Sequence, residues 1–240
     1  MTRFSRLTVL ETILDVGAVP TFTPKDATSA WRVIAASSAA GAPAIELTYR
    51  AENGLEVFRE VAERLPAEAP RVILGAGTVY DAPTAAMFIA AGAAFIVGPT
   101  FVPEIARLCN RRKIAYIPGC GSATEISDAE EFGMEIVKLF PAGAFDGPAF
   151  IRALLNPSPW SRVMPTAVPP TQDAMAAYFG AGAAAVGVGP GLITDELQAE
   201  PDTSILEGRI RELLGWIRTA RDRRGEATGV AAIGGAGVGA

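Results

Sequence analysis

MEIVKLFP, residues 134–141, reads as a buried β-strand that carries one lysine, Lys138. Strand side chains alternate between two faces, so Lys138 shares a face with Ile136 and Phe140. Burial lowers the pKa of a lysine, and a neutral amine is a nucleophile that forms Schiff bases with carbonyl compounds. A lysine near a strand end can instead extend its ammonium group to water. The stretch alone leaves both interpretations open.

The composition of the whole chain excludes several kinds of catalytic site. Its 240 residues include no histidine, and its only lysines are Lys25, Lys113 and Lys138. A Ser-His-Asp triad, a Cys-His pair and a histidine-bound zinc site are therefore excluded. General acid–base catalysis in this chain would have to use a carboxylate, a lysine, a tyrosine or water.

Charge and hydropathy bear on partners and location. The net charge is −5 and no basic block is present, so we expect no nucleic-acid partner. No uninterrupted apolar run reaches the length of a membrane span, so we expect no membrane partner. Cys109 and Cys120 are the only cysteines, so we expect no disulfide framework. We therefore expect a cytoplasmic location.

Short apolar strands alternate with longer helical patterns along the chain. The predicted strands cover 18–23, 43–48, 71–74, 94–97, 114–117, 135–140, 162–166 and 184–188. Amphipathic or alanine-rich segments between them predict helices, a helix over 3–16 precedes the first strand, and a helix over 205–221 follows the last. Eight such βα units are typical of a (β/α)8 TIM barrel, and a doubly wound open sheet is the alternative.

We therefore predict an α/β fold in the form of a (β/α)8 barrel, with an N-terminal helix before the first strand. One barrel domain spans 1–224. The remaining 225–240 are rich in Gly and Ala and nearly uncharged, which predicts a flexible C-terminal tail.

Barrel enzymes place their chemistry at the C-terminal ends of the strands. At the end of the second predicted strand, Glu46, Thr48 and Arg50 occupy every second position and so share one face. A buried structural ion pair would account for Glu46 and Arg50. The functional interpretation is a general acid/base beside an arginine that binds a carboxylate bidentately.

With Lys138 at the same end of the barrel, these residues suit class I aldolase chemistry. The lysine attacks the keto group of a 2-oxo acid and forms an iminium ion, which withdraws electrons from the neighbouring carbon. Arg50 would hold the carboxylate, and Glu46 would move protons. This chemistry requires no metal and no cofactor.

Four segments carry a family resemblance: IELTYR at 45–50, GAGTV at 75–79, IPG at 117–119 and VKLFPA at 137–142. In their order and spacing the chain resembles the 2-keto-3-deoxy-6-phosphogluconate / 4-hydroxy-2-oxoglutarate (KDPG/KHG) aldolase family, class I, over roughly residues 4–195. The resemblance implies that Lys138 is the Schiff-base lysine and that Glu46 is the general acid/base. It also implies a homotrimer.

The resemblance further implies a set of substrate-binding residues. Arg50 and Thr78 would bind the pyruvate carboxylate, Phe140 would pack on the substrate, and Thr166 would lie near the aldehyde portion. Pro99, at the end of the fourth predicted strand, is counted with them.

The departures from the family pattern concern phosphate binding. After the seventh strand the family has Pro-Thr-Gly-Gly, whereas this chain reads PTAVPP at 165–170; after the eighth it has Gly-Gly-Ser, whereas this chain reads VGPG at 188–191. An arginine often found after the first strand is missing from PTFTP at 20–24. Glycine lets phosphate approach the backbone, and proline has no N–H to donate.

We therefore expect an aldolase that cleaves a 2-keto-3-deoxy or 4-hydroxy-2-oxo acid to pyruvate and an aldehyde, with a preference for a substrate without phosphate. One alternative is a keto-acid-binding barrel that serves as a sensor or assembly subunit without catalysis. Another is a pyruvate-using decarboxylase or isomerase on the same site.

Overall fold

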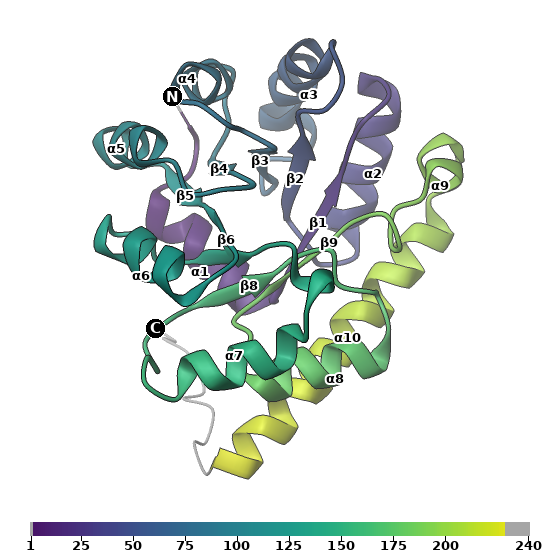
Figure 1. The fold of residues 1–240 in the computed structure, drawn as a ribbon. Helices are drawn as coiled ribbons and strands as arrows, with labels where there is room; N and C mark the ends of the chain where they lie inside the picture. The colour runs from purple at the N-terminus through teal and green to yellow at the C-terminus, as the bar shows by residue number, and fades with distance from the viewer. Residues whose placement is uncertain (1, 229–240) are drawn as a thin grey trace, which may run out of the picture.

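The computed structural model describes residues 2–228 and shows an α/β fold with parallel strands (Figure 1). Six strands form one sheet in the order β5-β4-β3-β2-β1-β9, and three form a second sheet in the order β6-β7-β8. The larger sheet forms a half-barrel. The strands are β1 (Ala18–Phe22), β2 (Ala44–Thr48), β3 (Ile73–Gly77), β4 (Phe95–Val97), β5 (Ala115–Ile117), β6 (Gly119–Cys120), β7 (Val137–Leu139), β8 (Val163–Pro165) and β9 (Val186–Val188).

Helices follow the strands along the chain and surround them (Figure 1). They are α1 (Arg6–Val16), α2 (Ala27–Ala39), α3 (Gly54–Glu68), α4 (Ala82–Ala90), α5 (Pro103–Arg112), α6 (Ala123–Glu131), η1 (Ala142–Ala144), α7 (Gly147–Leu155), α8 (Gln172–Ala181), α9 (Asp195–Ala199) and α10 (Ser204–Thr228). Several begin at a side chain that accepts a hydrogen bond from a free backbone N–H of the first turn, as Asp26 does for α2 and Thr171 for α8.

The prediction of an α/β fold with parallel strands is confirmed, and the observed strands depart most from the prediction at the third strand and after the fifth. The glycines after Leu74 predict that the third strand ends there, before a turn over 75–78, but β3 continues through Gly75 and Gly77. Both glycines are needed there because a Cβ at Gly75 would lie 2.2 Å from the Phe95 ring, and one at Gly77 would lie 1.8 Å from Glu46. They therefore serve close packing inside the sheet instead of a turn.

A further strand, β6, follows β5 where the sequence predicted none. Pro118 has no N–H for the ladder, and the strand resumes after it as β6, which pairs with β7 in the second sheet. A single parallel bridge between Thr166 and Gly187 connects the end of β8 to β9. The two sheets are thus linked through Pro118 and through this bridge.

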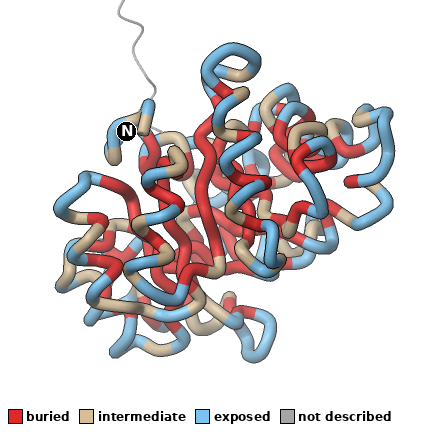
Figure 2. Tube along the Cα trace, turned by 90° about the horizontal axis from the view of Figure 1, so that it is seen from above, coloured by how far each residue is buried: buried red, intermediate tan, exposed pale blue. Residues whose placement is uncertain are grey.

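Buried residues form two layers. The larger hydrophobic cluster lies between strands and helices; exposed residues lie on loops and outer helix faces (Figure 2). The second cluster joins Val9, Leu10 and Ile13 of α1 to side chains from the strands, such as Ala44 of β2 and Ile73 of β3. The N-terminal helix therefore packs against the inward faces of the strands.

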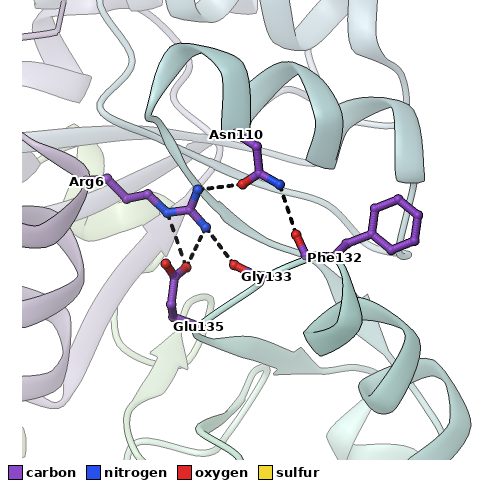
Figure 3. A network of polar contacts seen from close by, with 5 residues as sticks. All are labelled: Arg6, Asn110, Phe132, Gly133 and Glu135. Atoms are coloured by element: carbon purple, nitrogen blue, oxygen red, sulfur yellow. Dashed lines mark hydrogen bonds and ion pairs between the residues drawn. The ribbon is translucent and has the colours of Figure 1, made fainter.

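A polar network anchors α1 beside the segment that leads into β7 (Figure 3). The Arg6 guanidinium donates to Glu135 Oε2 at 2.6 Å, to Asn110 Oδ1 at 2.6 Å and to the Gly133 carbonyl at 2.7 Å. Asn110 in turn donates to the Phe132 carbonyl at 2.9 Å. Glu135, which was expected to open the sixth strand, instead holds the loop just before it.

At the C-terminus, α10 continues past Arg221 to Thr228 and so includes the first residues of the predicted tail. The remaining tail residues, 229–240, lie outside the described part of the chain. Within 2–228 no helix is both long enough and apolar enough to cross a membrane.

Candidate active site

A cavity of about 620 Å³ opens at the carboxyl ends of the strands. Its walls come from β1, β2, β7 and β9 and from the segments that follow these strands and β8. The lining residues used below are Thr21, Thr23, Glu46, Thr48, Arg50, Lys138, Phe140, Thr166, Ala167, Gly187, Gly189, Pro190, Ile193, Thr194, Asp195, Glu196 and Gln198.

The alternation of strand side chains explains why the reactive groups meet. Ala44 of β2 and Ile136 before β7 belong to the inner cluster, and residues two positions further on share their orientation. Those residues are Glu46 and Lys138. They therefore face the same cavity above the inner apolar layer, close enough for the charge of each to shift the pKa of the other.

Glu46 is 1% exposed, and its environment disfavours the carboxylate form. Oε2 accepts a hydrogen bond from Thr21 Oγ1 at 3.3 Å, whereas Oε1 has no hydrogen-bond partner among residues 2–228. Burial raises the pKa of Glu46, and the charges of Lys138 and Arg50 and the Thr21 hydrogen bond oppose this rise only in part. One carboxyl oxygen, Oε1, is thus buried against Gly77 without a hydrogen bond from the protein.

Lys138 is 8% exposed, and its Nζ lies 4.8 Å from the centre of the Phe140 ring. Burial lowers the pKa of Lys138; the Glu46 charge raises it, and the Arg50 charge lowers it further. The net shift favours the neutral amine at a pH where an exposed lysine is charged. One interpretation of the strand was that the ammonium group extends into water. The burial of Lys138 excludes it.

Arg50 lies just beyond β2, at the side of the cavity. Its Nε donates to Thr78 Oγ1 at 3.2 Å, and the peptide N–H of Tyr49 donates to the Gly77 carbonyl at 2.8 Å. Thr78 has a left-handed backbone with φ 61°. It positions the guanidinium and is absent from the cavity lining.

Of the predicted site residues, the structure brings together Lys138, Glu46, Arg50, Phe140 and Thr166 around one cavity. Thr78 reaches it through Arg50. Pro99 does not line it: the Pro99 carbonyl packs against Gly119, where a Cβ would lie 2.1 Å away. Among the described residues no group of three or more His, Cys, Asp or Glu side chains is arranged to hold a metal ion.

Comparison with known proteins agrees with this arrangement. A family model described as KDPG and KHG aldolase matches residues 10–207. The chain belongs to this family.

Individual members of the KDPG and KHG aldolase family match over much of their length. A 2-dehydro-3-deoxy-phosphogluconate aldolase from Treponema pallidum is 35% identical over 160 residues, which cover 67% of this chain and 74% of that protein. One from Pseudomonas aeruginosa is 39% identical over 131 residues, covering 55% of this chain and 58% of that protein. These relatives are named as lyases of the aldolase type.

A solved structure of KDPG aldolase from Legionella pneumophila shares the fold, with a TM-score of 0.75 and 21% identity. The match covers 88% of this chain and 98% of that chain. That structure is described as holding pyruvate captured as a covalent carbinolamine intermediate.

In this family member the loops after β8 and β9 pack against each other at the rim of the cavity. A Cβ on Gly191 would lie 2.7 Å from Pro170. The N–H groups of Thr171, Leu192 and Ile193 donate to protein carbonyls within these loops, and proline at 169, 170 and 190 has none to donate. The three prolines and the three bonded N–H groups reduce the number of backbone donors that these loops offer to an anion.

Sequence reasoning missed the part of the site that α9 supplies. No helix was expected between 188 and 205, yet Asp195, Glu196 and Gln198 of α9 line the cavity. It also missed Thr21, which bonds Glu46, and Thr23, whose hydroxyl lies 2.6 Å from that of Thr48. Val19 of β1 points into the inner cluster, and side chains alternate along a strand, so the positions 21 and 23 could have been predicted to face the cavity. The five-residue α9 has no comparable signal.

Proposed function

We propose that this chain is a class I, Schiff-base aldolase that cleaves a 2-keto-3-deoxy or 4-hydroxy-2-oxo acid to pyruvate and an aldehyde. The observation that carries the proposal is the buried Lys138 beside Glu46 at the base of one cavity, with Arg50 at its side. The names of its relatives support the reaction type. The carbinolamine described for the Legionella structure supports a covalent route.

The first step joins Lys138 to the substrate. The neutral Nζ attacks the C2 carbonyl carbon, and the oxygen takes up protons and leaves as water, so an iminium ion remains. Glu46, whose pKa burial raises, is suited to deliver a proton to the departing oxygen. No group of the described residues hydrogen-bonds its Oε1, so no such contact competes for that proton.

The second step breaks the carbon–carbon bond. The Glu46 carboxylate takes the proton of the C4 hydroxyl, the C3–C4 bond breaks, and its electron pair moves toward the iminium to give an enamine. The aldehyde leaves. Protonation of the enamine at C3 and addition of water then release pyruvate and restore the amine. The sequence is redox-neutral, so it needs no oxidant or reductant.

The other lining residues would bind and orient the substrate. Arg50, held by Thr78, would pair with the carboxylate of the pyruvate half. The Phe140 ring would pack on the three-carbon unit near Lys138. Thr166, at the end of β8, would face the aldehyde half.

We further propose that the substrate carries no phosphate. The loops after β8 and β9 contain three prolines, and several of their N–H groups are already bonded. A competition between 2-keto-3-deoxy-6-phosphogluconate and 2-keto-3-deoxygluconate should favour the second. A strong preference for the phosphorylated compound would contradict this reading of the loops.

We also propose that the two sheets close into one (β/α)8 barrel, since Pro118 and the Thr166–Gly187 bridge connect them at both borders. A homotrimer is proposed from the family resemblance, and light scattering on the purified protein would measure it. The cytoplasmic setting and the assignment of 1–224 as one domain stay predictions.

Borohydride trapping tests the Schiff base directly. The chain should be incubated with pyruvate and sodium borohydride, digested, and searched for a carboxyethyl group on each of its three lysines. Lys138 should be modified, while Lys25 and Lys113 stay unmodified. Lys25→Met should behave like the wild type, and Lys138→Met should take up no label.

An unmodified Lys138 at saturating pyruvate would contradict the mechanism. A retro-aldol rate no higher in the wild type than in Lys138→Met would instead favour the binding-only alternative. A panel of 4-hydroxy-2-oxo acids with pyruvate release as the readout separates these outcomes.

A further inference from the structure

One wall of the cavity contains a buried side chain that the proposed mechanism does not use. Gln198 of α9 is 3% exposed and lines the cavity. Its Oε1 has no hydrogen-bond partner among the described residues 2–228. A buried amide oxygen without a partner is costly, so a bound molecule that donates a hydrogen to it would be favoured.

The main chain around Gln198 is firmly held. Arg32 of α2 donates from Nη1 to the Ala199 carbonyl at 2.8 Å and to the Gln198 carbonyl at 3.4 Å. At the other end of α9, Thr194 Oγ1 accepts from the Leu197 N–H at 3.3 Å. These contacts fix the backbone of α9 against α2, so the amide side chain is presented at a defined place.

The charged side chains of α9 that line the cavity are acidic, and the neighbouring cations Lys25 and Arg32 lie outside the lining. These acidic side chains are Asp195 and Glu196, which line the same cavity as Gln198. Asp195 forms an exposed ion pair with Lys25 at 3.7 Å, and the Thr194 hydroxyl and the helix backbone hold the pKa of Glu196 low. The cations in the lining are Arg50, just after β2, and Lys138 of β7, on the proposed pyruvate side.

The polar groups of α9 are therefore acceptors or neutral amides. A phosphate here would face the Glu196 carboxylate, which disfavours it. Hydroxyl groups are better suited, because each can donate to a carboxylate or to Gln198 Oε1 and accept from the Gln198 amide nitrogen.

We propose that Gln198 and Glu196 form a subsite for the distal hydroxyl groups of an uncharged, polyhydroxylated aldehyde tail. This assignment rests on the proposed aldolase function and specifies its substrate class. In this subsite, Gln198 accepts a hydrogen bond from one hydroxyl of the tail, and Glu196 accepts a hydrogen bond from the neighbouring hydroxyl. Both are specificity residues, and neither touches the bond that breaks.

A matched pair of substrates tests the subsite. 2-Keto-3-deoxygluconate and 4-hydroxy-2-oxohexanoate share the reacting carbons and differ by the two tail hydroxyls. The wild type should cleave the hydroxylated compound with the higher kcat/KM. Gln198→Leu should lower this preference by about tenfold or more, because one site for a tail hydroxyl is lost. Glu196→Gln should lower it by a smaller factor.

Controls keep the interpretation specific. Glu200→Gln alters an exposed acid next to the end of α9 and outside the lining, so it should leave the preference unchanged. Borohydride trapping of pyruvate on Lys138 should stay at the wild-type level in Gln198→Leu, which shows that the inner site is intact.

Two failures are distinguishable. If the wild type releases no pyruvate from either compound and takes up no label, the proposed aldolase function is wrong. If it releases pyruvate and labels normally but Gln198→Leu keeps the wild-type preference, the subsite is wrong. A wild type that favours 2-keto-3-deoxy-6-phosphogluconate over both compounds would also overturn the subsite.

Discussion

Gly77 of β3 leaves the space that the Glu46 carboxylate fills on the neighbouring strand. A Cβ at position 77 would lie 1.8 Å from Glu46 Oε1, well inside any allowed contact. Because Glu46 and its neighbours are buried, the carboxylate cannot move aside freely. The glycine is thus a condition for placing the proposed acid/base.

The substitution Gly77→Ala should therefore displace Glu46. We expect kcat to fall by about 10²-fold, since a shift of about 1 Å in a reacting group has that effect. Overpacking should lower the free energy of unfolding by about 1–3 kcal/mol. Steady-state pyruvate release and urea unfolding would measure the two effects.

Gly180→Ala is the matched control, because a Cβ there would meet nothing within 4 Å. Gly180 lies in α8, where alanine should add about 0.5–1 kcal/mol to stability and leave kcat unchanged. Equal activities of the two alanine variants would show that Gly77 does not position Glu46.

Glu46→Gln should slow turnover and also change its pH dependence. We expect kcat to fall by about 10²–10⁴-fold, which is the usual contribution of general acid–base catalysis. The Glu46 charge raises the pKa of Lys138, so its removal should lower that pKa further. The acid limb of borohydride trapping with pyruvate should then move to lower pH. A shift to higher pH would show that the two groups are not coupled as described.

Arg50→Lys should weaken binding of the keto acid more than it slows the chemical steps. A lysine cannot form the two parallel hydrogen bonds that a guanidinium makes with a carboxylate. We expect KM to rise about tenfold with a smaller change in kcat. Thr78→Val removes the acceptor of the 3.2 Å bond from Arg50 and should raise KM by a smaller factor. Thr78→Ser keeps the hydroxyl and should keep the wild-type KM.

The buried pair should reduce stability. The pKa of Lys138 is lowered, so stability rises as pH increases from that lowered pKa to the usual 10.5 of lysine. The pKa of Glu46 is raised, so stability falls as pH increases from the usual 4.5 of glutamate to that raised pKa.

In a double variant, Glu46→Gln with Lys138→Met, neither group titrates, so both of these contributions to the pH dependence of stability are absent. At neutral pH we expect it to be as stable as the wild type or more stable, by up to about 4 kcal/mol. Urea unfolding across the pH range would test this, and a double variant clearly less stable than the wild type would contradict it.

Local patterns predicted the order of elements well. The eight apolar strands expected from the sequence contain β1 to β5 and β7 to β9 wholly or in part, because strand burial leaves a clear apolar signal. Lys138 was recognisable for the opposite reason: a charged residue interrupts that signal. Glu46 and Arg50 could be placed with it because strand ends converge at one side of the fold.

The remaining features depend on contacts between distant segments. Gly75 and Gly77 resembled a turn because the Phe95 ring and the Glu46 carboxylate that require them come from neighbouring strands. Whether Pro99 faced the cavity likewise depended on its packing against Gly119. The role of Gln198 follows from the anchoring of α9 by Arg32, which is 166 residues away in the sequence.

The Arg32 anchor has a consequence for engineering. It binds α9 through main-chain carbonyls, which every amino acid provides, so substitutions at 195, 196 and 198 should leave the helix in place. A combinatorial library confined to these three positions could therefore diversify the aldehydes that are produced or consumed. Lys138, Glu46 and Arg50 would stay constant throughout such a library, as a shared source of pyruvate enamine.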